Sequence, residues 1–297
     1  MLTRPITRGI TRPITRPLVR QSSTFNPLTL FAQGQQGAWY DPSDLTTLFQ
    51  DAAGTTPVTA DGDPVGLMLD KSRELERGPE LVTNGTFDAD LSGWTSSTGS
   101  FQWGSGGVVG RSSTGITDEF YQSVNTAIGS FYVVEVEINN FTLNPEGYVD
   151  GLVPNTLENT GVNQFVFKAT ATSHNVGIIA TGADIEFTRI SVKELPGNHA
   201  SQPTTAAKPT YRTDGTLRWL EFDGVDDQLV ATIPGITNAT VAIAKSTGTE
   251  ITYPVDLSGG TFTMNETNYG IIVREGEFTA QEEANVIAYL NEKAGIS

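Results

Sequence analysis

The stretch FYVVEVEINNFTL, from Phe131 to Leu143, alternates apolar and polar side chains. A period of two places the apolar side chains on one side of an extended chain, as in a half-buried antiparallel strand. The same alternation recurs in NQFVFKATAT (Asn163–Thr172) and DIEFTRISVKEL (Asp184–Leu195). Turn residues recur at a spacing of about 8 to 12 residues, which is typical of β-sandwiches and jelly rolls. The sequence therefore predicts an all-β fold.

The segments on either side of this region have a different pattern of residues. Residues 37–72 and 197–275 contain short apolar pieces interrupted by Asp-Pro, Gly-Thr and Asp-Gly pairs, which favour short strands and turns. One helix is predicted from Ala280 to about Lys293, because Thr279 and Glu282 have the spacing of a capping box. We therefore expect strands throughout, with a single helix near the C-terminus.

The composition limits how such a fold is stabilised. A chain of 297 residues is long enough for two ordinary domains, each with its own core. It contains no cysteine, which excludes a disulfide-stapled scaffold and thiolate metal sites and fits a reducing compartment. No run of eighteen apolar residues is present, so we expect no membrane insertion.

The N-terminal residues repeat a basic unit. In TRPITRGITRPITRPLVR (Thr3–Arg20) an arginine returns every four residues, and an extended chain places the arginines on one face with three isoleucines: Arg4, Arg8, Arg12, Arg16, Arg20, Ile6, Ile10 and Ile14. Prolines stiffen the stretch and disfavour the amphipathic helix of a transit peptide. No apolar segment follows, so no secretory signal is expected. Residues 1–24 are interpreted as an extended anchoring arm, with a solvated tail as the alternative.

The arm differs in charge from the rest of the chain. Residues after Arg20 carry 13 of the 18 basic side chains and all 34 acidic ones, a net charge of −21. An acidic body repels the phosphates of nucleic acids, so no nucleic-acid partner is expected. A basic arm on such a body indicates docking onto an acidic protein surface.

Four segments resemble modules of tailed-phage and prophage virion proteins that look like concanavalin-A-like or laminin-G-like sandwiches. They are GAWYDPSDLTTLFQDAAGTTPVTADGDPVGLMLDKS (Gly37–Ser72), GNHASQPTTAAKPTY (Gly197–Tyr211), LEFDGVDDQLV (Leu220–Val230) and YGIIVREGEFTAQEEANVIAYLNEKAG (Tyr269–Gly295). In that family DKS runs directly into GNHA through a short glycine-rich link. Here about 120 residues separate them, which implies a second domain inserted into a surface loop.

The insert resembles the jelly rolls of carbohydrate-binding modules. The similarity lies in its opening, ELVTNGTFDADLSGWT, and its closing strand, FTRISVKEL. We therefore expect a basic arm at residues 1–24, a discontinuous sandwich at 25–78 and 196–297, and an inserted jelly roll at 79–195. Extended arms that satisfy one another's edges favour a homo-oligomer, with a trimer as the favoured number.

Enzymatic motifs are missing from the sequence. It has two histidines, neither beside a nucleophile motif, and no phosphate-binding loop, dinucleotide fingerprint or zincin helix. Three acidic groups are candidates for glycosidase carboxylates: Asp88 with Asp90, Glu135 with Glu137, and Asp223 with Asp226 and Asp227. The alternation of Glu135 and Glu137 with valine indicates a solvent-facing strand, and the third group is typical of a tight turn. We expect no catalytic residue and no enzyme.

Ligand-binding candidates come from aromatic and acidic residues of the insert. Saccharide sites combine aromatic surfaces with a few polar groups, and Trp103, Tyr121 and Tyr148 are the candidates; Trp103 alternatively caps the core, where Trp94 is expected to lie. The only cofactor suggested is calcium at Asp88, by analogy with similar jelly rolls, with a turn-forming role as the alternative.

These observations predict a structural protein of a tailed-phage virion surface, synthesised in the bacterial cytoplasm. Its arm would attach to capsid or tail proteins, and its lectin-like domains would project outward as a head decoration, head fibre or minor tail protein. The alternative is a receptor-recognition protein, a tail fibre or adhesin, that binds cell-surface glycans. A third hypothesis is that the protein is an enzyme that degrades polysaccharide.

Overall fold

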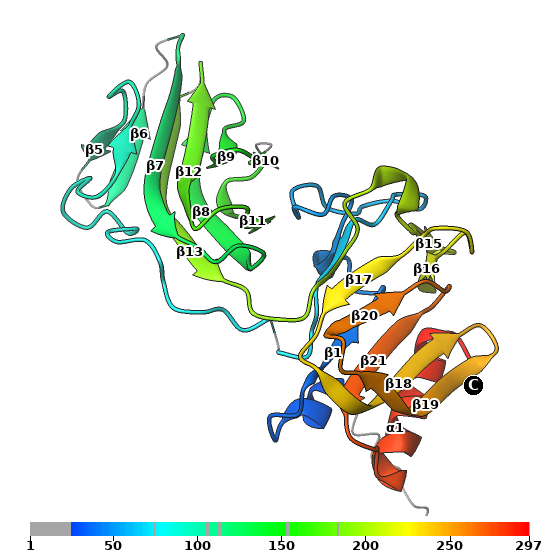
Figure 1. Ribbon diagram of the computed structural model, residues 1–297. Helices are drawn as coiled ribbons and strands as arrows, with labels where there is room; N and C mark the ends of the chain where they lie inside the picture. Colours follow the sequence, from blue (N-terminus) through cyan, green and yellow to red (C-terminus); the bar gives the residue numbers. More distant parts are fainter. Residues whose placement is uncertain are drawn as a thin grey trace, which may run out of the picture.

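The structure, a computed structural model, describes residues 25–73, 75–104, 107–111, 115–152, 155–182 and 184–296. The described chain is built from antiparallel sheets with one α-helix near its C-terminus, which confirms the predicted all-β fold (Figure 1). The predicted anchoring residues, from Arg4 to Arg20, lie outside the described residues. No helix in the described part of the chain is both long and apolar enough to span a bilayer.

One lobe, here called the proximal lobe, contains both ends of the described chain. Its elements are η1 (Pro27–Phe31), β1 (Gly37–Tyr40), η2 (Leu45–Thr47), β2 (Leu48–Phe49), β3 (Leu67–Met68), β14 (Ala200–Ser201), η3 (Thr205–Ala207), β15 (Thr210–Thr213), β16 (Arg218–Glu221), β17 (Leu229–Thr232), β18 (Ile236–Lys245), β19 (Gly248–Leu257), β20 (Thr261–Met264), β21 (Gly270–Glu275) and α1 (Ala280–Lys293).

Two sheets of the proximal lobe enclose its core. The sheet β1-β21-β18-β19 packs on the sheet β2-β3-β14-β17-β20 through side chains such as Tyr40, Met68 and Phe262. Helix α1 covers the other face of the first sheet with Val286 and Leu290. The capping box predicted at its start is present, since Thr279 Oγ1 accepts from the Glu282 amide and the Glu282 carboxylate accepts from the Thr279 amide.

The other lobe, here called the inserted lobe, is formed by β4 to β13. Its strands are β4 (Thr95–Ser96), β5 (Gln102–Gly104), β6 (Val108–Arg111), β7 (Thr117–Asn125), β8 (Phe131–Phe141), β9 (Glu146–Val149), β10 (Asn155–Thr156), β11 (Gly161–Lys168), β12 (Ser173–Thr181) and β13 (Ile185–Glu194). They form two five-stranded sheets, β10-β9-β12-β7-β4 and β11-β8-β13-β6-β5.

The alternating stretch at Phe131 forms the centre of the second of these sheets. Strand β8 pairs with β11 on one side and β13 on the other, and its Val134 lies opposite Phe165 and Val192. These side chains face Phe120 and other residues of the opposing sheet in one buried cluster. Trp94 belongs to this core, as expected, and stacks on Phe120 with ring centroids 5.1 Å apart.

The inserted lobe arises between two neighbouring strands of the proximal lobe. Strand β14 pairs directly with β3, so that Ala200 lies opposite Met68 and Ser201 opposite Leu67. Every strand from β4 to β13 pairs only with other strands of that group. The chain therefore leaves the proximal sheet after β3 and returns to it at β14. The exact residue limits of the two units stay a prediction.

A buried carboxylate joins the two chain segments at this junction. Asp70, which is fully buried, accepts hydrogen bonds from the amides of Trp39, Ser72 and Asn198 and from the Ser72 hydroxyl, at 2.9, 2.8, 2.9 and 2.9 Å respectively. Asn198 in turn donates its side-chain amide to the Gly37 carbonyl at 2.6 Å. The DKS and GNHA elements, far apart in the sequence, thus form one hydrogen-bonded network.

His199 completes the junction network. Its Nδ1 accepts from the Asp70 amide at 2.9 Å, which leaves the ring proton on Nε2 to be donated to the Leu195 carbonyl at 3.0 Å. Burial lowers the pKa of His199, so the ring stays neutral and both nitrogens serve the backbone. His199 is therefore a structural residue of the junction.

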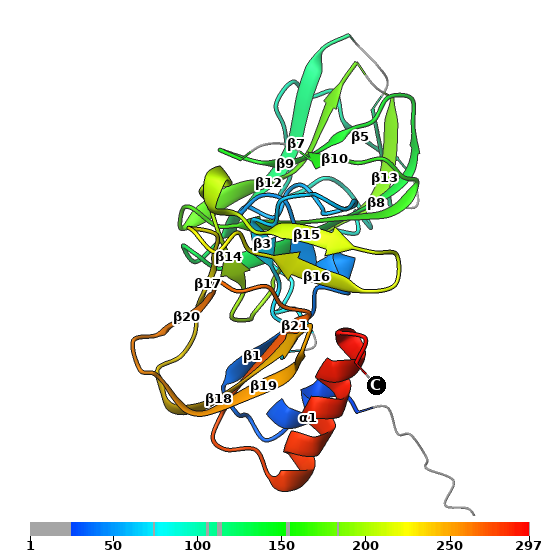
Figure 2. The same ribbon diagram turned by 90° about the vertical axis from the view of Figure 1, so that its right-hand side faces the viewer.

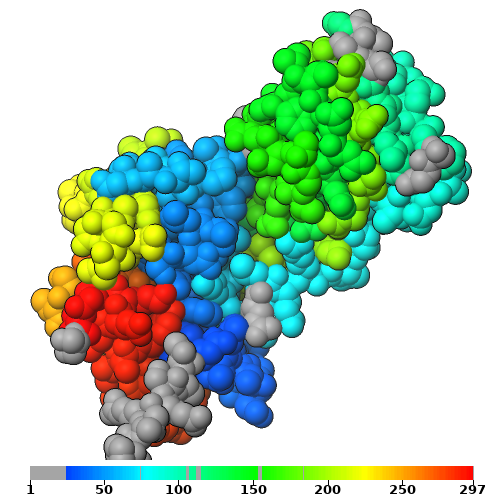
Figure 3. All heavy atoms as spheres, turned by 180° about the vertical axis from the view of Figure 1, so that it is seen from behind, coloured from blue at the N-terminus to red at the C-terminus, as the bar shows by residue number. Residues whose placement is uncertain are grey.

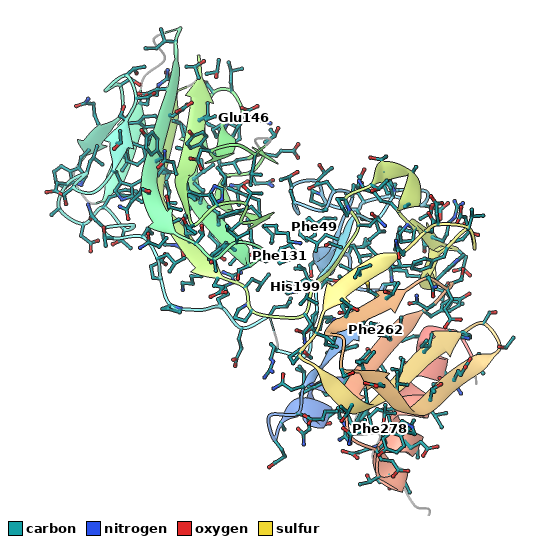
Figure 4. The ribbon with its side chains drawn as sticks, in the orientation of Figure 1. Phe49, Phe131, Glu146, His199, Phe262 and Phe278 are labelled. Carbon is teal, nitrogen blue, oxygen red and sulfur yellow. The ribbon has the colours of Figure 1, made fainter. Side chains whose placement is uncertain are left out.

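An apolar cluster fixes the lobes against each other beside this network. Phe131 packs the edge of its ring on His199 with centroids 4.9 Å apart, and Figure 4 shows both residues at the junction near Phe49. The cluster combines side chains of the two lobes: Phe49, Leu67, Leu69, Phe131, Val133, Val166 and Leu195. The outer face of β8 near the junction is thus covered by the proximal lobe.

Replacing Asp70 by alanine is expected to destabilise the protein strongly. The change leaves buried donors of Trp39, Ser72 and Asn198 without an acceptor, and we expect a loss of about 2–4 kcal/mol in the free energy of unfolding. Urea denaturation followed by fluorescence measures it. Asp256→Ala is the control, because Asp256 is exposed and is hydrogen-bonded to Ser258, two residues along the same turn. Equal losses in the two variants would contradict this role of Asp70.

Candidate functional site

Two of the predicted saccharide-binding residues meet on the outer face of the sheet β10-β9-β12-β7-β4. Tyr121 on β7 and Tyr148 on β9 lie on either side of Gly177 on the central strand β12, in one row of the sheet. Their ring centroids are 5.8 Å apart with an interplanar angle of 49°. The neighbouring residues Phe120 and Val149 belong to the core, so both tyrosines point away from it.

Gly177 is required for this arrangement. A Cβ atom at this position would lie 1.9 Å from the Phe120 carbonyl oxygen, so no side chain fits there without moving the strand. The middle strand therefore carries no side chain between the two rings, and Gly177 itself is buried. Tyr121, Tyr148, Gly177 and the two glutamates described next are called the tyrosine face.

Acidic side chains stand beside the two rings. Glu119 on β7 and Glu146 on β9 both lie opposite Ile179 of β12, two residues along the strands from the tyrosine row. Burial, together with the negative charges of Glu119 and Asp150, raises the pKa of Tyr148 to about 12. The Tyr148 hydroxyl therefore stays protonated across the physiological range, and it donates to the Glu119 carboxylate.

A buried aspartate holds the strand that carries Tyr121. The Asp118 carboxylate accepts five hydrogen bonds from the end of β4 and the loop after it: from the hydroxyls of Ser96, Ser97 and Ser100 and from the amides of Thr98 and Ser100, at 2.5 to 3.0 Å. Burial opposes ionisation, but the bonds from Ser100, Ser96 and Thr98 outweigh it and lower the pKa of Asp118 far below its usual range. The loop is thereby fixed to β7 next to Tyr121.

Trp103 does not join the two tyrosines. It lies on β5, in the opposite sheet, and its register partner Val109 is fully buried. The indole Nε1 donates to the Phe87 carbonyl at 2.7 Å, and 40% of the side chain is exposed. Trp103 thus shares the inward-facing side of its strand, and its exposed part borders a groove lined also by Gly110 and Glu186. Saccharide binding by Trp103 and its alternative role as a cap on the core both stay predictions.

No metal-ligand arrangement is found around Asp88 in the described residues. Asp88 is exposed, and the one group of three acidic or histidine ligand atoms within 4.8 Å of one another in the described part of the chain is Asp223, Asp226 and Asp227. Asp223 accepts from the amides of Val225, Asp226 and Asp227, so these residues build a turn, as predicted. Calcium at Asp88 stays a prediction.

The remaining titratable candidates have structural partners. Glu135 pairs with Arg77 and with Arg189, the latter at 3.1 Å, and these hydrogen bonds and charges outweigh burial and lower its pKa. Glu135 thereby ties the chain entering the inserted lobe to the outer face of β8. His174 donates through Nδ1 to the Asp150 carboxylate at 2.9 Å, because its Nε2 accepts from the Thr170 amide at 3.2 Å.

A groove of about 750 Å³ lies at the junction of the two lobes. Its lining includes Phe131, Lys168, His199 and Gln228. The His199 nitrogens are already used by the junction network, so the groove offers fewer free polar groups than its composition suggests.

The sequence indicated the two tyrosines as candidates for saccharide binding but not Gly177, Glu119 or Glu146, which the structure places beside them. The available signal was a glycine inside the strand pattern SHNVGIIAT, which indicates a close approach of another backbone. The glutamates gave no signal of their own, because a polar residue at alternate positions of a strand is the ordinary solvent-facing pattern.

No protein-family model matches the sequence, and no curated protein matches it. Among solved structures, the N-terminal CBM22-1-CBM22-2 tandem domain of Xyn10C from Paenibacillus barcinonensis is similar with a TM-score of 0.32 and 10% identity, over 71% of this chain and 94% of that one. The adhesin domain of Epf from Streptococcus pyogenes is similar with a TM-score of 0.25 and 9% identity, over 82% of this chain and 98% of that one. Both TM-scores are below 0.5, so neither similarity indicates a function.

The Asp118 network is expected to make the stability of the protein sensitive to acid. Because the folded-state pKa of Asp118 is lowered, its contribution is present above the unfolded-state pKa of about 4 and is lost as the pH falls below that value. Asp118→Asn should therefore lower the free energy of unfolding at neutral pH, and its difference from the wild type should shrink toward about pH 3. Urea denaturation at a series of pH values measures this, and a difference that does not change with pH would contradict it.

Proposed function

We propose that this chain is a non-catalytic surface-display protein whose inserted lobe binds saccharide at the tyrosine face. The observation that carries the proposal is the row Tyr121–Gly177–Tyr148, in which two aromatic side chains lie next to each other over a strand position without a side chain. Sugar rings bind to aromatic surfaces through their C–H groups, and neighbouring polar groups fix their hydroxyls. The carboxylates of Glu146 and of Glu119, which already accepts from the Tyr148 hydroxyl, supply such groups.

The placement of the tyrosine face supports a display role. The described chain begins beside α1, where Phe25 packs on Tyr289 with ring centroids 6.1 Å apart. Figures 2 and 3 show these first residues and α1 at one end of the molecule and the inserted lobe at the other. An anchor formed by residues 1–24 would therefore leave the tyrosine face at the distal end.

The proposed setting is the surface of a tailed-phage virion, as a head decoration, a head fibre or a minor tail protein. Support for this setting comes from the sequence alone: the four segments similar to virion modules, and a basic arm on an acidic body. The arm would attach to capsid or tail proteins, and a homo-oligomer, with a trimer favoured, would present several tyrosine faces at once. A glycan-binding tail fibre or adhesin would use the same face.

Removing either aromatic ring is expected to weaken saccharide binding by about tenfold or more, since such contacts contribute roughly 1–3 kcal/mol. Tyr121→Ala and Tyr148→Ala should both lose binding on a glycan array and in calorimetry with the saccharides that the wild type binds. Tyr253→Ala is the control, because Tyr253 lies in the proximal lobe on β19 and is 40% exposed. If the wild type bound no saccharide, or if Tyr253→Ala weakened binding equally, the proposal would be wrong.

Deleting residues 1–20 tests the anchoring role. Since the described fold begins at Phe25, the truncated protein should keep the circular dichroism spectrum and unfolding midpoint of the full chain but should not be incorporated into particles. Quantitative mass spectrometry of purified virions measures the occupancy. Truncated protein present at normal occupancy would contradict anchoring by the arm.

Release of reducing ends from polysaccharides by the pure protein tests the non-catalytic assignment. The expected result is none, because Glu135 is held by two arginines and both histidines are used by structural hydrogen bonds. Released reducing ends would instead favour the third hypothesis, a polysaccharide-degrading enzyme.

A further inference from the structure

We propose that the tyrosine face selects saccharides by charge, binding those that carry free amines and rejecting those that carry carboxylates. This inference rests on the proposed saccharide-binding function and names the ligand class. It follows from the acidic side chains that border the two rings, all of which belong to the inserted lobe.

The carboxylates flank the aromatic row from both ends. Glu119 and Glu146 lie on strands to either side of Ile179, so that their side chains share the outer face with the tyrosines. On the other side of the Tyr148 row, Asp150 accepts from the Asn175 amide at 3.0 Å, and its side chain is 42% exposed. Figure 4 shows Glu146 far from the junction residues Phe131 and His199.

These charges have no basic partner within the described residues. The ion pairs of the described chain that involve lysine or arginine include none of Glu119, Glu146 and Asp150. The Glu119 carboxylate accepts from the Tyr148 hydroxyl, and Asp150 accepts from the His174 ring and the Asn175 amide. A ligand on the tyrosine face therefore meets an uncompensated negative potential at a distance short enough to escape most screening by salt.

The negative potential of these carboxylates favours binding of some classes of sugar over others. A carboxylate of a uronic or sialic acid placed about 4 Å from Glu119 or Glu146 would be repelled, and an ammonium at the same place would be attracted. Each such charge pair changes the binding constant by a factor of roughly five even at the dielectric constant of water. The flat side of a tyrosine ring also attracts cations, because its potential is negative. Both effects favour an amine-bearing sugar such as glucosamine, with neutral sugars in between.

The test compares oligosaccharides of equal length: glucosamine oligomers, N-acetylglucosamine oligomers and oligogalacturonate, below neutral pH where sugar amines are protonated. Titration calorimetry with the full-length protein should give affinities that decrease in that order. The preference for the amine over the N-acetyl form should be about fivefold or more at low ionic strength and should shrink as salt is added.

Variants separate local charge from the overall negative charge of the protein. Glu146→Gln and Glu119→Gln should each reduce the preference for the amine about threefold to tenfold at low salt, with little change in binding of the N-acetyl oligomer. Glu277→Gln is the control, since it removes one exposed charge from the proximal lobe. Tyr121→Ala should weaken binding of all ligands alike.

The outcomes distinguish the two levels of the proposal. If the wild type binds none of these or any other saccharide, the proposed function is wrong and this inference with it. If it binds saccharide and Tyr121→Ala abolishes binding, but oligogalacturonate binds as well as the glucosamine oligomer, only the inference on charge is wrong. The same holds if Glu277→Gln changes the preference as much as Glu146→Gln does.

Discussion

The buried carboxylate of Asp70 is the constraint on which the arrangement of the molecule depends. It binds backbone amides from three segments, at Trp39, Ser72 and Asn198, and thereby closes the proximal lobe across the two ends of the insertion. His199 extends the network to Leu195, the residue after β13. Since buried donors without an acceptor are costly, this network keeps β3 and β14 paired whatever the long segment between them contains. An entire sandwich can therefore be carried on one loop.

The same junction sets where the inserted lobe points. Phe131 and Val133 are on the outer face of β8, which the alternating pattern alone would leave in solvent, and they are buried against Phe49 and Leu69 of the proximal lobe. Arg77 ties the entering chain to Glu135 on the same face. The sheet that carries the tyrosine face is the other sheet of the sandwich. The neighbouring lobe thus covers the outer face of β8 near the junction, and the proposed binding surface lies on the opposite sheet.

The sequence predicted the parts of the structure that local patterns determine. Period-two alternation located β8, β11 and β13, and the capping box at Thr279 located the start of α1. What it could not predict depends on strand order. Tyr121 and Tyr148 become neighbours only because β7 and β9 both pair with β12, and Trp103 turns toward the core only because β5 is an edge strand next to β6. The amino-acid pattern of a strand does not show which distant strand it pairs with. Gly177 is the exception in this sheet, because the close approach of the β7 backbone requires a glycine there.

The central claim is that ligand binding takes place on β7, β9 and β12, on the outer face of the inserted lobe. Backbone amide chemical shifts of the isotopically labelled protein, recorded by nuclear magnetic resonance during titration with an oligosaccharide that it binds, test this directly. The account predicts that the shifted resonances cluster at Glu119 to Tyr121, Glu146 to Tyr148 and Gly177 to Ile179, and that resonances around Trp103 and around the junction groove at Lys168 stay unchanged. Shifts centred on Trp103 or on the junction groove, with the tyrosine face unaffected, would contradict it.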